Sequence, residues 1–232
     1  KNAGIINPFA KLCSTFISLF KSNNLNWDLL KQRARKAPRN QDRGRFLAFL
    51  EAFELIYGQY QTLLDANNQV DFDDMIGAAI GHVESNQYQH RYQHILVDEF
   101  QDISRGRTKL IKAIKTASPN CTFFAVGDDW QAIYRFTGSD IGVMRNFSSE
   151  FGPTATTQLD KTFRFNNQIL EFTTRFVMEN PAQIQKQITS NVNLKNPQIF
   201  ISCTATKESQ VAFGCLKLIN KNPLYKYFMH YL

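Results

Sequence analysis

The segment 95–102 reads ILVDEFQD, so two adjacent acids follow directly on a short apolar run. In open α/β sheets, ligands bind at the carboxyl ends of the strands, which is where Asp98 and Glu99 would lie. A carboxylate there can hold Mg²⁺ directly or through water, and its neighbour can orient or deprotonate a water that attacks a phosphate. The alternative is an acid that ends a strand and caps the next helix, which is the commoner use of a bare Asp-Glu pair.

A second apolar run, within FFAVGDDWQAIYRFTG at 123–138, also ends in polar residues, here Gly-Asp-Asp. Gln131 follows, and its amide can donate and accept hydrogen bonds and could touch a terminal phosphate. Tyr134 and Phe136 are two residues apart, so in extended chain both rings point to one face and could stack on nucleobases. The alternative for this ring pair is a place in the core.

The segment 159–170, LDKTFRFNNQIL, is the third candidate. Arg164 falls between a predicted strand and a predicted helix, where its guanidinium could reach nucleotide phosphates across a cleft. Phe163 could lie against an adenine ring. The alternative for Arg164 is an ion pair on the surface.

The elements that would position these side chains begin with an all-helical segment, residues 1–70. Apolar side chains recur there every three or four positions over 9–20 and 46–64, which predicts two amphipathic helices. Between them, residues 31–45 hold seven basic side chains and one acid, with breaks predicted at Pro38 and Gly44. This stretch is either a solvated surface or a patch that contacts phosphates.

From residue 71 short apolar runs alternate with amphipathic stretches, which predicts an α/β fold with a parallel sheet flanked by helices. Continuous apolar runs are typical of strands covered on both faces, so we expect the first two strands to be buried. The predicted helices are 72–83 (capped by Asp71), 105–117, 141–147, 166–178 and 208–219, and the predicted strands are 93–97, 121–126, 154–159 and 198–202.

The chain has 232 residues, 43% hydrophobic and 20% charged, a composition that excludes disordered and fibrous classes. No apolar run approaches the ~18–20 residues that cross a bilayer, and we expect no export signal and no membrane partner. The four cysteines lie far apart in sequence without a Cys-x-x-Cys pair, which indicates reduced thiols and a cytoplasmic protein.

Charge is unevenly distributed along the chain, whose net charge is +7. Residues 1–70 hold ten basic and five acidic side chains, residues 71–160 eight and twelve, and residues 161–232 nine and three. Basic flanks around an acidic middle suit a protein that holds a polyanion outside and a metal cation inside. The alternative, charge spread over surface helices for solubility, is the one that charge alone favours.

Four motifs in this order and spacing closely resemble those of superfamily I DNA helicases of the UvrD/Rep type: DFDDMI (71–76), VDEFQD (97–102), VGDDWQAIYRFTG (126–138) and LDKTFRFNNQIL (159–170). The Asp-Asp-Trp-Gln and Phe-Thr-Gly wording is most similar to the helicase IV branch of that family. The resemblance spans about residues 71–180. It implies a partial RecA-like sheet of the P-loop NTPase type, ATP and Mg²⁺ as cofactors, single-stranded and duplex DNA as partners, and a location in the bacterial cytoplasm or nucleoid.

The same resemblance implies roles for individual residues. Asp98 would hold Mg²⁺, Glu99 would activate the attacking water, and Gln131 would link phosphate sensing to DNA contact. The remaining implied roles are stacking on single-stranded DNA by Tyr134 and Phe136, adenine stacking by Phe163, and a γ-phosphate contact by Arg164.

The sequence also departs from the family pattern. Phe136-Thr137-Gly138 stands where UvrD has Trp-Arg-Gly, which removes one cationic DNA contact, and Phe163 stands where the family usually has tyrosine. A P-loop needs two glycines five apart followed by lysine, and no two of the eleven glycines have that separation. We find no candidate for the later family motifs after Pro181.

We therefore interpret the chain as an interior segment of a larger helicase: a helical insertion at 1–70, the C-terminal half of the first RecA-like motor domain at 71–152, and the start of the second at 153–232. The parent protein would unwind DNA in the 3′-to-5′ direction by hydrolysing ATP, while this chain alone would hydrolyse ATP negligibly.

Two alternatives stay open. One is a non-catalytic nucleic-acid-binding or scaffold module derived from a helicase. The other is a metal nuclease that uses Asp98, Glu99 and Asp102.

Overall fold

The computed structural model describes residues 7–36 and 41–193. The chain divides into two compact units, of which the first ends at Ala155 and the second begins at Thr156. The fold mixes helices with two small parallel sheets, in agreement with the predicted α/β class. The elements predicted at 198–202 and 208–219 lie outside the described residues. Within the described ranges no helix combines the length and the apolar character needed to span a membrane.

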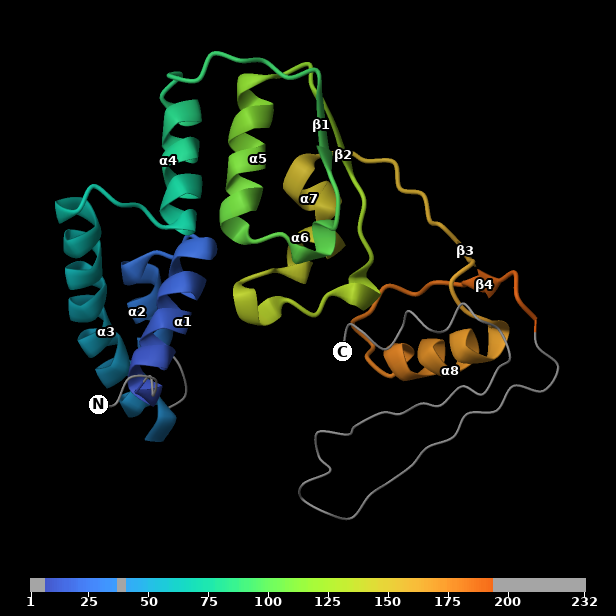
Figure 1. The fold of residues 1–232 in the computed structure, drawn as a ribbon, viewed down its shortest axis with the longest axis horizontal. Coiled ribbons are helices and arrows are strands. Elements are labelled where there is room, and N and C mark those ends of the chain that lie inside the picture. Colours follow the sequence, from blue (N-terminus) through green and yellow to red (C-terminus); the bar gives the residue numbers. More distant parts are fainter. Residues whose placement is uncertain (1–6, 37–40, 194–232) are drawn as a thin grey trace. The chain divides into compact units, whose positions relative to one another are not determined.

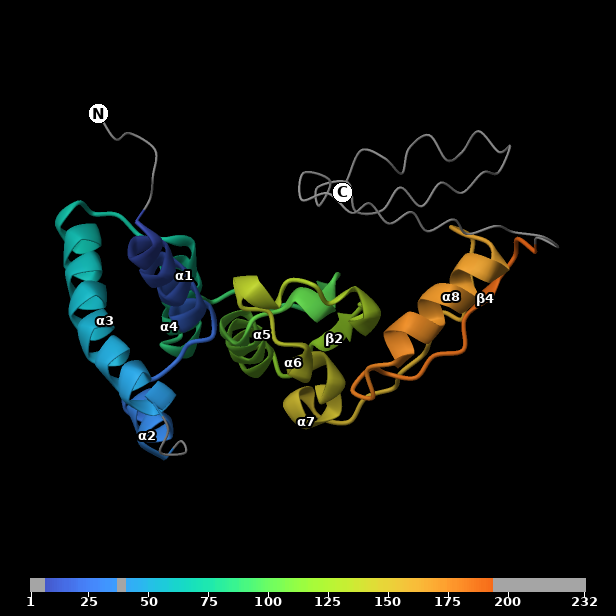
Figure 2. The ribbon, with the colours of Figure 1, turned by 90° about the horizontal axis from the view of Figure 1, so that it is seen from below.

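Three helices open the first unit: α1 (Pro8–Ser22), α2 (Trp27–Lys36) and α3 (Gln41–Ala66). Figure 2 shows the ribbons of these three helices. Aromatic rings join them, because Phe16 lies 4.6 Å from Phe53 and Phe20 lies 4.3 Å from Trp27, measured between ring centroids. Both helices predicted for this region are confirmed, and each is longer at both ends than predicted.

The basic stretch 31–45 is more helical than predicted. Its first part belongs to α2, and Gly44 lies inside α3. The predicted break at Gly44 is therefore wrong, because one glycine costs a helix only about 1 kcal/mol and the packed aromatic face of α3 offsets that cost. Pro38 lies outside the described residues.

Helix α4 (Phe72–Glu84) begins as predicted, with Oδ1 of Asp71 accepting from the backbone N–H of Asp74 at 2.8 Å. The same residues join α4 to α1, because the ammonium of Lys21 donates to Asp71 at 2.6 Å and to both carboxylate oxygens of Asp74 at 2.8 Å. The hydroxyl of Tyr60, on α3, donates to the same Asp71 oxygen at 2.9 Å. The Lys21 side chain is only 5% exposed. We call these four residues the Lys21 cluster.

Strands β1 (His94–Val97) and β2 (Thr122–Ala125) pair in parallel, with Ile95 opposite Phe123 and Leu96 opposite Phe124. Helix α5 (Arg105–Ala117) connects them as predicted and lies beside α4 (Figure 1). The side chain of Ser104 caps α5 by accepting from the N–H of Arg107.

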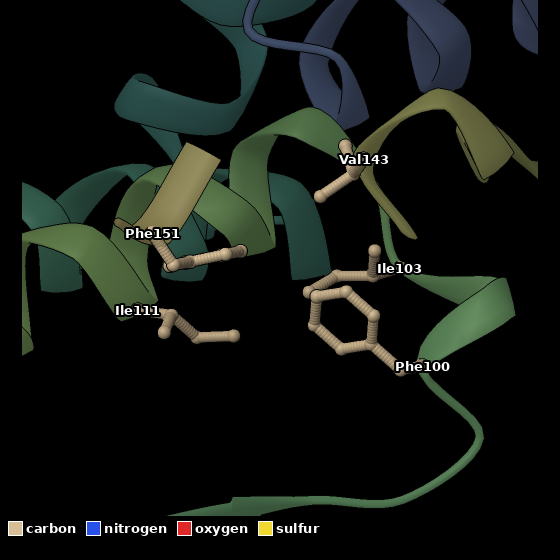
Figure 3. Close-up of a cluster of buried hydrophobic side chains, with 5 residues drawn as sticks. All are labelled: Phe100, Ile103, Ile111, Val143 and Phe151. Carbon is tan, nitrogen blue, oxygen red and sulfur yellow. The ribbon is translucent and has the colours of Figure 1, made fainter. Parts of the chain in front are cut away.

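One face of this sheet covers the core of the first unit. Side chains from that face pack against a buried cluster of five residues, shown in Figure 3: Phe100, Ile103, Ile111, Val143 and Phe151. On the other face Leu96 is 74% exposed and Phe124 is 56% exposed. The predicted burial of both faces is therefore wrong for the described residues, because no element among them packs over that second face.

The helix predicted at 141–147 is two short helices, α6 (Ile141–Arg145) and α7 (Phe147–Phe151). Asn146 separates them, and its side-chain amide donates to the carbonyl of Gly142 at 2.9 Å. Beyond Asn146, Phe151 belongs to the core cluster and Phe147 packs against it.

The second unit contains β3 (Lys161–Thr162), α8 (Asn167–Met178) and β4 (Thr189–Ser190), with the two strands paired in parallel. Helix α8 agrees with the helix predicted at 166–178, except that Asn166 is its N-cap and not its first residue. The strand predicted at 154–159 is wrong. A β-strand exists only where a ladder partner is present, and the pairing with β4 begins where Thr189 N–H donates to the carbonyl of Asp160.

Candidate active site

Asp98 and Glu99 directly follow β1, and both side chains are exposed at the carboxyl end of the sheet. The segments that follow β1 and β2 stay hydrogen-bonded to each other beyond the strands. Val126 N–H donates to Val97 O at 2.9 Å, and Phe100 N–H donates to Val126 O at 2.8 Å. Neither acid caps a helix through its side chain, because α5 is capped by Ser104. The interpretation of this pair as a simple helix cap is thereby excluded.

The carboxylate of Glu99 is held by Gln101. Glu99 has a left-handed backbone conformation (φ 48°, ψ 44°), which is uncommon for a residue other than glycine. A 3₁₀ turn, η1 (Phe100–Asp102), follows, and within it Nε2 of Gln101 donates to Oε2 of Glu99 at 2.7 Å. The carboxylate therefore has a fixed partner although it lies at the surface.

Gln101 also reaches the polar residues that follow β2. Its Oε1 accepts from the backbone N–H of Asp128 at 3.0 Å. Asp128 in turn accepts from Nε2 of Gln131 at 2.8 Å, across the 3₁₀ turn η2 (Asp129–Gln131). A continuous chain of hydrogen bonds thus joins two of the predicted site residues, Glu99 and Gln131.

Sequence reasoning assigned no role to Gln101 or Asp128. The signal that could have identified Gln101 is an uncharged amide that directly follows the apolar Phe100 within a segment of acids. A buried amide needs partners for both its donor and its acceptor, and the polar residues after β2 are the nearest source of one.

Gly127 allows this approach. A Cβ atom at this position would lie 2.8 Å from Oε1 of Gln101 and 3.1 Å from the backbone nitrogens of Phe100 and Gln101. Because two of these three neighbours are backbone atoms, they could not move aside cheaply. The ends of β1 and β2 can come this close only with glycine at 127.

The acids fit a magnesium nucleotide in part. Mg²⁺ typically takes one or two protein carboxylates and completes its shell with water and phosphate oxygens, and the exposed carboxylate of Asp98 suits that use. The described residues contain no group of three or more His, Cys, Asp or Glu side chains that could hold a metal ion.

Asp102 differs from the two acids beside it. Its Oδ1 is buried and has no hydrogen-bond partner among the described atoms. Burial, with a smaller contribution from the nearby charge of Glu99, raises the pKa of Asp102 above its ordinary value.

Tyr134 and Phe136 lie together at the surface, with ring centroids 6.0 Å apart and 45% and 69% exposure. The core alternative for these rings is thus excluded. The predicted extended chain is also wrong, because the N–H of Thr137 donates to the carbonyl of Tyr134 and forms a 3₁₀ turn, η3 (Arg135–Thr137). The tight turn still brings both rings side by side.

The end of α1 supports this aromatic turn. Gly138 ends η3 with φ 96°, and a Cβ atom there would lie 2.2 Å from Oγ of Ser22. Gly106, in the first turn of α5, approaches the same residue, since its Cβ would lie 2.8 Å from the Ser22 carbonyl oxygen. Ser22 thus lies in a notch between two glycines.

Phe163 and Arg164 lie in the second unit, between β3 and α8, and both are exposed. The backbone N–H of Arg164 donates to Oγ1 of Thr162 at 3.3 Å. The first unit links Glu99 to Gln131 by hydrogen bonds and separately brings Tyr134 and Phe136 together. The roles predicted for Phe163 and Arg164 stay predictions.

Residues 7–152 match the family model of the UvrD/REP helicase N-terminal domain. The chain is 45% identical over 130 residues to DNA helicase IV of Escherichia coli K12, which covers 56% of this chain and 19% of that protein. It is 30% identical over 146 residues to the ATP-dependent DNA helicase UvrD1 of Mycobacterium leprae, covering 57% and 19%. With the ATP-dependent DNA helicase PcrA of Staphylococcus aureus Mu50 the identity is 29% over 161 residues, covering 67% and 22%.

The chain thus spans about a fifth of the length of these relatives. The match to the family model is continuous over more than half of the chain, and it includes both acids, the Gln101 bridge, Gln131 and the aromatic turn. As its motifs predict, the chain belongs to the UvrD/REP helicase N-terminal domain family.

Proposed function

We propose that this chain is part of an ATP-dependent DNA helicase that unwinds DNA in the 3′-to-5′ direction. The observation that carries the proposal is the hydrogen-bonded chain from Glu99 through Gln101 and Asp128 to Gln131. In this proposal, these hydrogen bonds join a water-activating acid to a phosphate-sensing amide. The relatives of this polypeptide are named DNA helicases.

In this proposal residues 71–152 are the C-terminal half of the first RecA-like motor domain, residues 1–70 are a helical insertion, and residues 153–232 begin the second motor domain. The parallel pair β1–β2, with α5 as its crossover and acids at its carboxyl end, supports the first of these assignments. The contacts of α1 with α4 and α5 are consistent with a helical insertion that packs against that domain.

Each site residue then has a distinct task. Asp98 holds Mg²⁺, and Glu99 orients and deprotonates the water that attacks the γ-phosphate of ATP. The bound metal ion supplies neutralisation of the phosphate charge. Tyr134 and Phe136 stack on bases of single-stranded DNA, for which their exposure is suited. In the second motor domain, Phe163 stacks on adenine and Arg164 contacts the γ-phosphate.

A second candidate function is a non-catalytic module that binds single-stranded nucleic acid. The exposed ring pair favours it. The two candidates differ in whether the parent protein hydrolyses ATP.

The deciding experiment is a steady-state ATPase assay on the parent polypeptide, with and without single-stranded DNA. We expect DNA-stimulated turnover that falls by about 10²- to 10⁴-fold in Glu99→Gln, because the variant keeps the shape of the side chain and loses the base. Glu51→Gln is the matched control, since Glu51 is an exposed glutamate of α3. A wild-type parent without ATPase activity would support the non-catalytic module, and full activity in Glu99→Gln would refute the assigned role.

A further inference from the structure

We infer that Gln101 is a positioning residue that fixes the carboxylate of Glu99 to the loop carrying Gln131, so that the catalytic acid and the phosphate sensor move together. The inference rests on the proposed function, which gives Glu99 its catalytic role. Gln101 itself touches neither substrate nor metal in this scheme.

The burial and hydrogen bonding of Gln101 indicate this role. Its side chain is 2% exposed, yet both ends of its amide are satisfied, by Glu99 on one side and by the N–H of Asp128 on the other. Because a backbone N–H can only donate, the atom facing Asp128 is the amide oxygen, and the NH₂ group must then face Glu99. A side chain of this length with one donor and one acceptor end is what the bridge needs.

The loop after β2 has little freedom to move away from Gln101. Phe100 N–H donates to Val126 O at 2.8 Å, and a Cβ at Gly127 would collide with Gln101. The position of the Asp128 N–H is therefore set by the same close approach that places Gln101. Glu99, exposed and in a left-handed conformation, receives its orientation from this buried amide.

The bridge also connects the acid to the aromatic turn. The chain runs from Asp128 through η2 directly into the turn that carries Tyr134 and Phe136. A base that stacks on these rings would contact the same loop in which the backbone N–H of Asp128 donates to Gln101. Gln101 is then the route by which contact with DNA reaches the acid.

The contact can be tested on this chain by amide hydrogen exchange, read by NMR at Asp128. Gln101→Met keeps the length of the side chain and removes both hydrogen bonds, so we expect Asp128 N–H to exchange at least about tenfold faster. Gln101→Glu keeps the acceptor, so protection should remain. Gln89→Glu, at an exposed glutamine, is the control. Unchanged protection in Gln101→Met would overturn the inference.

The functional consequence is tested in the parent polypeptide. In Gln101→Glu a second carboxylate faces Glu99 in place of the donor, so we expect kcat to fall about 10- to 100-fold, the KM for ATP to change less than about threefold, and stimulation by single-stranded DNA to be lost. An active wild type with an unaffected Gln101→Glu would overturn this inference alone. An inactive wild type would overturn the proposed function and this inference with it.

Discussion

Gly127 and Gly138 mark two places where the chain approaches itself too closely for a Cβ atom. Gly127 lets the polar residues after β1 and β2 come together, and Gly138 lets the aromatic turn pack against the end of α1. Gly138 also has a positive φ of 96°, a conformation in which any residue with a Cβ is strained. The positions of the acids and the rings therefore depend on residues that carry no side chain.

Gly138→Ala is expected to lower the free energy of unfolding by about 1–3 kcal/mol, from backbone strain and the clash with Ser22. Gly77→Ala is the matched control, because a Cβ at this position in α4 meets nothing within 4 Å. Alanine there should be neutral or stabilising by up to about 1 kcal/mol. Urea unfolding followed by circular dichroism measures both, and equal effects would contradict the role of Gly138.

The sequence was sufficient to locate the acids but not the bridge between them and Gln131. Asp98 and Glu99 could be placed because an apolar run ending in acids predicts a strand end by local pattern alone. The bond from Gln101 to Asp128 depends on the close approach at Gly127, a long-range feature that no local pattern encodes. The prediction that the rings of Tyr134 and Phe136 lie together is confirmed, although the extended backbone from which it follows is wrong. A 3₁₀ turn and an extended strand can both bring such rings together.

Among the elements, α1, α3 and α4 are held together by the Lys21 cluster. Burial by itself would lower the pKa of Lys21, but its hydrogen bonds to Asp71 and Asp74 raise the pKa above the ordinary lysine value. Burial would raise the pKa of Asp71, yet the hydrogen bond from Lys21 and further hydrogen bonds hold that pKa below the ordinary range. Both shifts show that the charged forms are favoured in the folded state.

Lys21→Met is expected to lower the free energy of unfolding by about 2–3 kcal/mol near pH 7. Removing one partner of a buried ion pair leaves charge uncompensated, and the partial exposure of Asp71 and Asp74 keeps the effect at the low end. Lys11→Met, at an exposed lysine of the same helix, is the control and should have little effect.

The stability difference between wild type and Lys21→Met should also depend on pH. The contribution of Asp71 is present above the ordinary aspartate pKa of about 3.9 and is lost as the pH falls through its lower folded-state value. The contribution of Lys21 is present below about 10.4 and is lost as the pH rises through its higher folded-state value. Unfolding measured from pH 2 to 11 should give a plateau between these limits. A difference that peaks inside the plateau would contradict the assignment.

Helices were easier to predict than strands for a physical reason. The bounds of α4, α5 and α8 follow from caps at Asp71, Ser104 and Asn166, which lie next to the helices they begin. The strand expected at 154–159 has suitable residues, but a strand needs a partner, and the partner found in the structure starts its pairing at Asp160. The exposure of Leu96 and Phe124 could not be predicted from the sequence for the same reason, because the burial of a strand face depends on which other element packs against it.

On the scale of the whole molecule, the net charge of +7 is concentrated in the two flanks of the sequence. We expect this chain to bind single-stranded DNA weakly, with an affinity that falls steeply as salt rises from about 50 to 200 mM. Replacing Tyr134 and Phe136 by alanine should weaken binding by about 1–3 kcal/mol for each base that loses its stack.

Fluorescence anisotropy with a labelled oligonucleotide measures both effects. A double change of Phe172 and Phe176 to alanine is the matched control, because these rings of α8 are also exposed. Affinity that is insensitive to salt, or equally reduced in the control, would argue against the DNA interface.

The parallel pairing of β1 with β2 has a consequence for how the site is made. Every paired position is 28 residues from its partner, as in His94 with Thr122, so this sheet cannot begin as a hairpin. During synthesis Glu99 and Gln101 leave the ribosome well before Asp128, whose backbone N–H holds Gln101. The nascent chain must close a loop containing all of α5 before Asp128 can donate to Gln101, so the bridge from Glu99 to the residues after β2 depends on the same long-range closure that pairs the two strands.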